Sequence, residues 1–283
     1  MIGTTVQIRD YPYGSHPSQF VRLYLPPGVQ RLPVAVVIHG GFWRQKYGIE
    51  LAEPLCADLV GHGVAAAAVE YRRVDRSLRD GSRSATDTVS AAGGGWPMTL
   101  ADVARAVDSL EASGQVLARG RLDLERVAAI GHSAGGHLAA WLAHRGSVRI
   151  GSVGGIEPTE TAVIVRGAVS QAGVLDLAAA ARGRLGNGAV IDLMEGSPGS
   201  VAQRYRHADP IGYVGDGARV ICVHGDADDT VPVDQSQRYV AAATTAGDPA
   251  ELVVLPGVGH FHLIDVEHPA WAFCRDRLLG LLA

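Results

Sequence analysis

The sequence has few cysteines, no long apolar run and no cluster of basic residues. Its three cysteines, Cys56, Cys222 and Cys274, lie far apart among apolar residues, which favours buried thiols in a reducing cytoplasm over a disulfide framework or a metal knuckle. No segment reaches the roughly 18 uninterrupted apolar residues that a membrane-spanning helix needs. The 29 acidic and 25 basic residues give a formal net charge of -4, and no basic run offers a phosphate backbone a footprint. We therefore expect a cytoplasmic protein that binds neither membranes nor nucleic acids.

We expect no export signal at the amino terminus, and the composition is that of a globular chain. Arg9 and Asp10 stand where a signal peptide would need apolar residues. Hydrophobic residues make up 47% of the 283 residues and charged residues 19%, which is enough apolar material for a core on both faces of a sheet. Because α/β chains of this length commonly form one domain, we predict a single domain over residues 1–283. The composition leaves open whether copies of the chain form a homo-oligomer.

Short β-rich runs alternate with longer stretches that suit helices, a pattern that predicts a mostly parallel central sheet with helices on both faces. Strands are expected at residues 6–8 and 20–25 as an antiparallel start, then at 34–38, 64–69, 126–130, 162–170, 219–223 and 251–255. Helices are expected at residues 49–60, 100–111, 134–144, 234–246 and 269–282. Two stretches do not fit this alternation, 72–95 and 182–207, and they are predicted to be loops or a lid over a site.

The motif Gly131-His132-Ser133-Ala134-Gly135 follows one of the buried strands and opens a helix. A serine hydroxyl is a poor nucleophile unless a tight turn presents it to a base, and flanking glycines permit such a strained turn. A glycine-rich turn in which Ser133 only caps a helix would show the same pattern. Three further motifs decide between these two interpretations.

The second motif, His39-Gly40-Gly41-Phe42-Trp43, directly follows the strand that ends at Ile38. Attack on a carbonyl makes its oxygen negative, and fixed backbone N–H groups stabilise that charge. We predict that the N–H groups of Gly41 and Phe42, together with that of Ala134 after the serine, form an oxyanion hole. The alternative is a plain glycine turn with Trp43 in the core.

The third motif, residues 224–232 (HGDADDTVP), follows the strand at 219–223 and contains three aspartates. A carboxylate here would orient the catalytic base and stabilise its protonated form. We favour Asp228, because Asp226 lies close to the turn and Asp229 is placed to cap the following helix.

The fourth motif, residues 256–261 (PGVGHF), places His260 in a glycine-containing loop after the last strand. Ser133, Asp228 and His260 thus occur in the chain order nucleophile, acid, base, each just past the carboxyl end of a predicted strand, where open parallel sheets place their sites. The four motifs together predict a serine hydrolase with these three catalytic residues.

Over nearly its whole length the sequence resembles the α/β-hydrolase superfamily. The segments HGGFWR at 39–44, GGWP at 94–97, GHSAGGHLA at 131–139 and HGDADDTVP at 224–232 are similar to those of the kynurenine formamidase (arylformamidase) and small carboxylesterase branch. The resemblance implies the α/β-hydrolase fold and hydrolysis of a carboxylic ester or an aryl formamide. It also implies that Asp228 is the acid and His260 the histidine. Phe42 stands where related esterases often carry a third glycine.

The predicted mechanism is acyl transfer from a small-molecule ester or amide to Ser133 and then to water, with no organic cofactor and no metal. Four residues beside the motifs are candidates for substrate contact, although core packing is equally compatible with the two tryptophans: Trp43, His132, Trp96 and Phe261. Asp176 is interpreted as a helix cap rather than a second acid. Three other functions fit the same motifs: an arylformamidase specific for N-formylkynurenine-type substrates, an acyltransferase, and a non-catalytic ligand-binding protein on this scaffold.

Overall fold

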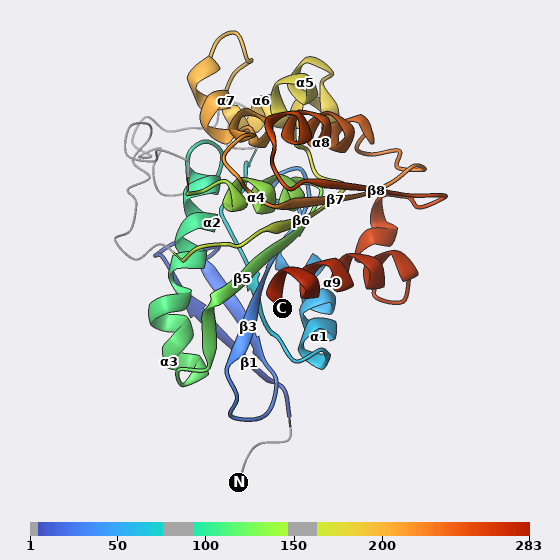
Figure 1. Cartoon of the computed structure of the whole chain (residues 1–283). Coiled ribbons are helices and arrows are strands. Elements are labelled where there is room, and N and C mark those ends of the chain that lie inside the picture. Colours follow the sequence, from blue (N-terminus) through green and yellow to red (C-terminus); the bar gives the residue numbers. More distant parts are fainter. Residues whose placement is uncertain (1–4, 76–92, 147–162) are drawn as a thin grey trace, which may run out of the picture.

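The computed structural model describes residues 5–75, 93–146 and 163–283, which build one eight-stranded sheet. The strand order is β1-β2-β4-β3-β5-β6-β7-β8, and all pairs from β4 onward are parallel (Figure 1). Both pairings of β2, with β1 and with β4, are antiparallel. The strands run over Gln7–Pro12 (β1), Phe20–Leu25 (β2), Leu32–Ile38 (β3), Ala65–Val69 (β4), Leu122–His132 (β5), Ala168–Gln171 (β6), Val220–Gly225 (β7) and Glu251–Leu255 (β8).

Helices cover both faces of the sheet, as the sequence predicts. On one face lie α1 (Glu53–Gly61) and α9 (Pro269–Leu282), and on the other lie α2 (Met98–Asp108), α4 (Ala134–Ala143) and α8 (Asp234–Ala246) (Figure 1). None of the helices in the described part of the chain is long and apolar enough to cross a bilayer. The described residues also contain shorter helical elements, namely Ile49–Leu51 (η1), Leu110–Gly114 (η2), Gln115–Ala118 (α3), Leu177–Arg182 (α5), Leu185–Met194 (α6), Ala202–Ala208 (α7), Pro210–Tyr213 (η4) and His260–Ile264 (η5).

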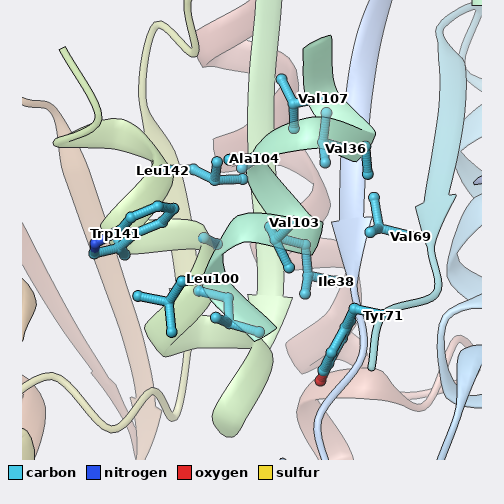
Figure 2. Close-up of a cluster of buried hydrophobic side chains, with 14 of the residues drawn as sticks. Val36, Ile38, Val69, Tyr71, Leu100, Val103, Ala104, Val107, Trp141 and Leu142 are labelled. Carbon is cyan, nitrogen blue, oxygen red and sulfur yellow. The ribbon is translucent and has the colours of Figure 1, made fainter. Parts of the chain in front are cut away.

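The central strands bury both faces, because their side chains alternate between two apolar layers. Val34, Val36 and Ile38 of β3 join one core cluster, and the intervening Ala35 and Val37 join the other. The first cluster is closed by the apolar stripe of α2, which recurs at intervals of three and four residues as in a helix that lies on a core. Figure 2 shows Leu100, Val103, Ala104 and Val107 of this stripe against Val36, Ile38 and Val69.

Two sequence-based expectations about secondary structure are wrong. The strand expected at 162–170 is confined to β6, because only Ala168–Gln171 reach β5 and β7 as ladder partners. The stretch 182–207 is predicted to be a loop or a lid over a site; it contains α6 and α7, so the loop interpretation is wrong, and the lid stays a prediction. Two of its glycines, Gly186 (φ 56°) and Gly188 (φ 82°), lie where α6 is interrupted by left-handed residues, so they break the helical pattern without abolishing the helix. Of the other expected loop, 72–95, residues 76–92 lie outside the described part of the chain.

A buried ion pair fastens the end of β4 to α2. Arg72 donates to Asp102 through Nε (2.8 Å), Nη2 (2.7 Å) and its backbone N–H (3.0 Å), and Gln19 donates to the same carboxylate from Nε2 (2.7 Å). Asp102 is fully buried and Arg72 is 6% exposed. Because each charge is removed from water, neither is tolerated without its partner.

We predict that Asp102→Ala lowers the free energy of unfolding by about 3–5 kcal/mol, since it leaves the Arg72 guanidinium buried and uncompensated. Urea unfolding measures the effect. Arg31→Ala is the control, because its 3.1 Å ion pair with Asp123 lies on the surface and should be worth at most about 1 kcal/mol. Equal losses in the two variants would contradict the buried-pair interpretation.

Candidate active site

Four loops at the carboxyl ends of the parallel strands supply the predicted site residues. Gly40 and Gly41 follow β3, Ser133 follows β5, Asp228 follows β7, and His260 begins η5 after β8. The carboxyl ends of parallel strands meet at one edge of the sheet, which is where such folds bind their ligands. The fold therefore carries these distant segments to a common edge.

Ser133 occupies a strained backbone conformation between β5 and α4, with φ 56° and ψ -117°. A non-glycine residue with positive φ persists only where its surroundings hold it. Here a Cβ on Gly131 would lie 2.1 Å from the Gly135 carbonyl oxygen, and a Cβ on Gly135 would lie 2.1 Å from that of Ile38. The Ser133 N–H donates to the Gln171 carbonyl (2.8 Å). Strand, helix and turn therefore pack so closely that only glycine fits on either side of the serine.

The segment after β3 turns through three consecutive left-handed residues: Gly41 (φ 108°), Phe42 (φ 53°) and Trp43 (φ 54°). Its backbone lies against the serine turn, since a Cβ on Gly40 would be 3.2 Å from the Ser133 Cβ. Ala134 is the first residue of α4, where backbone N–H groups have no acceptor within the helix. The structure thus brings Gly41, Phe42 and Ala134 into one neighbourhood, and their role as oxyanion donors stays a prediction.

Asp228 is the aspartate of residues 224–232 that meets the histidine. His260 Nδ1 lies 2.7 Å from Asp228 Oδ2, and Oδ1 accepts the N–H groups of Thr230 and Val231 (2.8 Å each). Burial raises the pKa of Asp228, but hydrogen bonds from His224 and His260 outweigh it and hold that pKa well below its ordinary value. Asp228 is therefore ionised and oriented toward His260.

The other two aspartates have local roles. Asp226 accepts the Gly257 N–H (2.7 Å), and Asp229 accepts the Thr230 hydroxyl (3.0 Å). The expectation that Asp229 caps the following helix is wrong, because α8 begins after Val233. Asp176, by contrast, is confirmed as the cap of α5, where its carboxylate accepts the Ala179 N–H (2.8 Å).

His224, which the sequence did not single out, lies beneath Asp228 and is fully buried. Its Nε2 is 3.3 Å from Asp228 Oδ2 and 2.9 Å from the Val231 carbonyl oxygen, and its Nδ1 lies 2.8 Å from the Ser236 hydroxyl. Because both groups facing Nε2 are acceptors, that nitrogen carries a proton. A histidine at the end of a buried strand, four residues before the candidate acid, was the available signal.

The His260 ring lies against the residue before the serine. Its centroid is 4.3 Å from that of His132, and His132 Nε2 is 3.0 Å from the His260 carbonyl oxygen. The structure thus places His260 between Asp228 and the serine turn, with Nδ1 toward the carboxylate.

The family model BD-FAE matches residues 21–242 of the sequence. The chain belongs to the BD-FAE family. No curated protein matches it. Several solved structures share its fold, and a truncated carbohydrate esterase from gut microbiota superposes with a TM-score of 0.77 at 21% identity, over 98% of this chain and 96% of that one.

Two further structures are similar to this BD-FAE chain. The propionate-bound esterase Est2 from Thermogutta terrifontis has a TM-score of 0.68 at 23% identity, over 99% of this chain and 96% of that one. The acetyl ester-xyloside bifunctional hydrolase from Caldicellulosiruptor lactoaceticus has a TM-score of 0.68 at 21% identity, over 93% and 89%. At these identities the likeness establishes the α/β-hydrolase fold, as the sequence predicts.

The four candidates for substrate contact differ sharply in exposure. Trp43 is fully buried and packs edge-on against His137 (5.3 Å between centroids), which favours the packing interpretation. Trp96 is 8% exposed and stacks on His207, and His132 is only 3% exposed. Phe261 is 62% exposed and meets the His260 ring edge-on at 5.2 Å. Of these four residues, Phe261 presents the largest surface to a ligand.

The segment that follows β3 also contacts the helical insertion between β6 and β7. Arg44 Nη2 donates to the Gly186 carbonyl (2.5 Å), and the Arg44 guanidinium lies 5.8 Å from the centre of the Phe42 ring. A Cβ on Gly186 would lie 2.5 Å from the Phe42 ring. The interrupted helix α6 therefore packs directly on the segment that follows β3.

Three buried imidazoles near the site resist protonation. Burial lowers the pKa of His39 and of His132 to about 3 and that of His137 to about 4, and in His132 the neighbouring His260 adds to the effect. The unfolded chain protonates its histidines near pH 6.5. Their contribution to stability is therefore complete above that pH and is lost as the pH falls toward 4 for His137 and toward 3 for His39 and His132. Burial raises the pKa of Asp209 to about 7, so this carboxyl works in the opposite direction between pH 4 and 7.

We predict that the free energy of unfolding falls by about 2–3 kcal/mol per pH unit between pH 6 and 4.5, the net effect of about two protons at about 1.4 kcal/mol each. Urea unfolding at pH 7, 6 and 5 measures the slope. His137→Gln removes one of these protons and should therefore reduce the slope by about 1.4 kcal/mol per pH unit. A stability that is unchanged between pH 7 and 5 would refute the neutral state of these imidazoles.

Proposed function

We propose that this protein is a serine hydrolase that cleaves small carboxylic esters, with Ser133 as nucleophile, His260 as base and Asp228 as the orienting acid. The observation that carries the proposal is the 2.7 Å contact between His260 Nδ1 and Asp228 Oδ2, in a histidine that packs beside the strained serine turn. Such an imidazole is held in one tautomer, with Nε2 left for proton transfer.

In the proposed mechanism, His260 Nε2 takes the Ser133 proton as the hydroxyl oxygen attacks the ester carbonyl. The ionised Asp228 stabilises the resulting imidazolium, and the N–H groups of Gly41, Phe42 and Ala134 bind the oxyanion. The tetrahedral intermediate collapses to an acyl-enzyme as His260 protonates the leaving alcohol. The same imidazole then activates water, which releases the acid and restores the serine. These steps need no metal or organic cofactor.

The ester class is supported by the names of the similar structures, which include a carbohydrate esterase, a propionate-bound esterase and an acetyl ester-xyloside hydrolase. Short acyl groups are therefore the first substrates to test. An aryl formamide is a second candidate, favoured by the motif resemblance in HGGFWR and GGWP and by the exposed aromatic ring of Phe261 beside His260.

We predict that Ser133→Ala lowers kcat/KM for the best substrate by about 10⁴-fold or more while the fold persists, because the nucleophile is lost. The measurement is a hydrolysis screen over acetyl, propionyl and butyryl esters and N-formylkynurenine, with circular dichroism as the folding control. A fluorophosphonate probe should label the wild type and not the variant. Undiminished turnover or labelling in Ser133→Ala would reject the assignment, and labelling without hydrolysis would point to an acyltransferase.

We predict that Phe261→Ala raises KM for aryl esters about 5- to 20-fold and changes KM for methyl or ethyl esters of the same acid less than about twofold. In the proposed mechanism His260 donates its proton to the leaving group. The Phe261 ring, which lies edge-on to His260, should therefore contact that part of the substrate. Loss of a buried aromatic contact is worth on the order of 1–2 kcal/mol. The expectation fails if both ester series respond alike. Val254→Ala, an exposed apolar change on β8, is the control.

A further inference from the structure

We propose that His132 is a positioning residue that holds the catalytic base in place, donating from Nε2 to the backbone carbonyl of His260 while its ring supports the His260 imidazole. This proposal rests on the proposed function of His260. The sequence suggested that His132 contacts the substrate. We propose instead that His132 acts indirectly, by positioning His260.

The geometry defines which nitrogen of His132 carries the proton. Nε2 lies 3.0 Å from the His260 carbonyl oxygen, an atom that can only accept, so Nε2 is the donor. The two ring centroids are 4.3 Å apart at an angle of 49°. With an exposed fraction of 3%, His132 has little surface for a substrate. Its contacts are with the base instead.

His132 can serve as a donor beside the base because it stays neutral. Burial and the neighbouring His260 lower the pKa of His132 to about 3. When His260 becomes an imidazolium during the reaction, a neutral ring at 4.3 Å adds no opposing charge. A protonated neighbour would raise the energy of the very state that the base must enter.

The hydrogen bond from His132 to the His260 carbonyl links η5 to the end of β5, next to Ser133. His132 is the last residue of β5, and Ser133 follows it directly, whereas His260 begins η5 after β8. The ladder partner of His132 on β6, Gln171, donates from Nε2 to the Leu263 carbonyl of the same η5 (2.5 Å). The side chains of His132 and Gln171 therefore hold η5 against β5 and β6. Ser133 and His260 are thus positioned by the same pair of strands.

The decisive experiment compares His132→Phe, which keeps an aromatic ring and removes the donor, with His132→Gln, which supplies an amide donor near the position of Nε2. We expect His132→Phe to lower kcat for the best ester about 10- to 100-fold, as removal of a supporting hydrogen bond does at other sites, with KM within about twofold. His132→Gln should recover at least about tenfold of that loss. A substrate-contact role would instead raise KM and leave kcat nearly unchanged.

His144→Phe is the matched control. His144 is an equally buried imidazole, with Nδ1 2.9 Å from Asp216 and Nε2 2.8 Å from the Tyr239 hydroxyl, in contact with none of the proposed catalytic residues. This variant should lower the melting temperature while kcat of the folded enzyme stays within about twofold. Equal losses of kcat in His144→Phe and His132→Phe would overturn the proposal, as would a wild-type kcat in His132→Phe.

A spectroscopic readout separates this proposal from the ester chemistry. The proton shared by His260 Nδ1 and Asp228 gives a strongly deshielded proton NMR signal, which we expect in the wild type and in His132→Gln, and broadened or lost in His132→Phe. If no ester is hydrolysed by the wild type, the proposed function fails while this signal still reports whether His132 orders His260. An unchanged signal in His132→Phe would overturn the positioning role.

Discussion

The strained backbone at Ser133 is the constraint on which the rest of the site depends. A left-handed non-glycine residue costs on the order of 1–3 kcal/mol and survives only when its surroundings leave no alternative. Here the surroundings are backbone atoms: a Cβ on Gly131 would meet the Gly135 carbonyl, one on Gly135 would meet the Ile38 carbonyl, and one on Gly40 would meet the His132 carbonyl. Because these positions leave no room for a Cβ, the close approach of β3, β5 and α4 requires glycine at all three. The segment that follows β3 packs against that turn, and the helical insertion packs against that segment.

Around this turn, hydrogen bonds and burial together decide which groups are charged. Asp228 stays ionised because two imidazoles and two backbone N–H groups surround it. His39, His132 and His137 stay neutral because burial penalises their charged forms. Asp228 is thus an ionised neighbour of His260, and His132, whose ring centroid lies 4.3 Å from that of His260, is a neutral one. This distribution of charge is the one that the proposed role of His260 as a catalytic base requires.

Much of the framework was predictable from local pattern. The strands Phe20–Leu25 and Glu251–Leu255 and the helices Asp234–Ala246 and Pro269–Leu282 begin and end where the sequence predicts, because turn residues bound each of them and their periodicity is unambiguous. The failures share a cause. Val163 and Val165 alternate like a strand but have no ladder partner, and the glycines of residues 182–207 interrupt a helix instead of excluding one. In both cases neighbours in space decide what the local pattern leaves undetermined.

The sequence by itself determined the fold class and the glycines that the serine turn requires, since both follow from short-range pattern and chemistry. It also predicted a nucleophile, an acid and a base in the chain order Ser133, Asp228, His260. Only the tertiary structure decided that Asp228 meets His260, that Asp229 caps no helix, that Trp43 is a core residue and that His132 bonds to the carbonyl of His260. Those outcomes depend on contacts between residues up to 128 positions apart. Distance along the chain carries no information about such contacts, because the packing of strands and helices alone brings these side chains together.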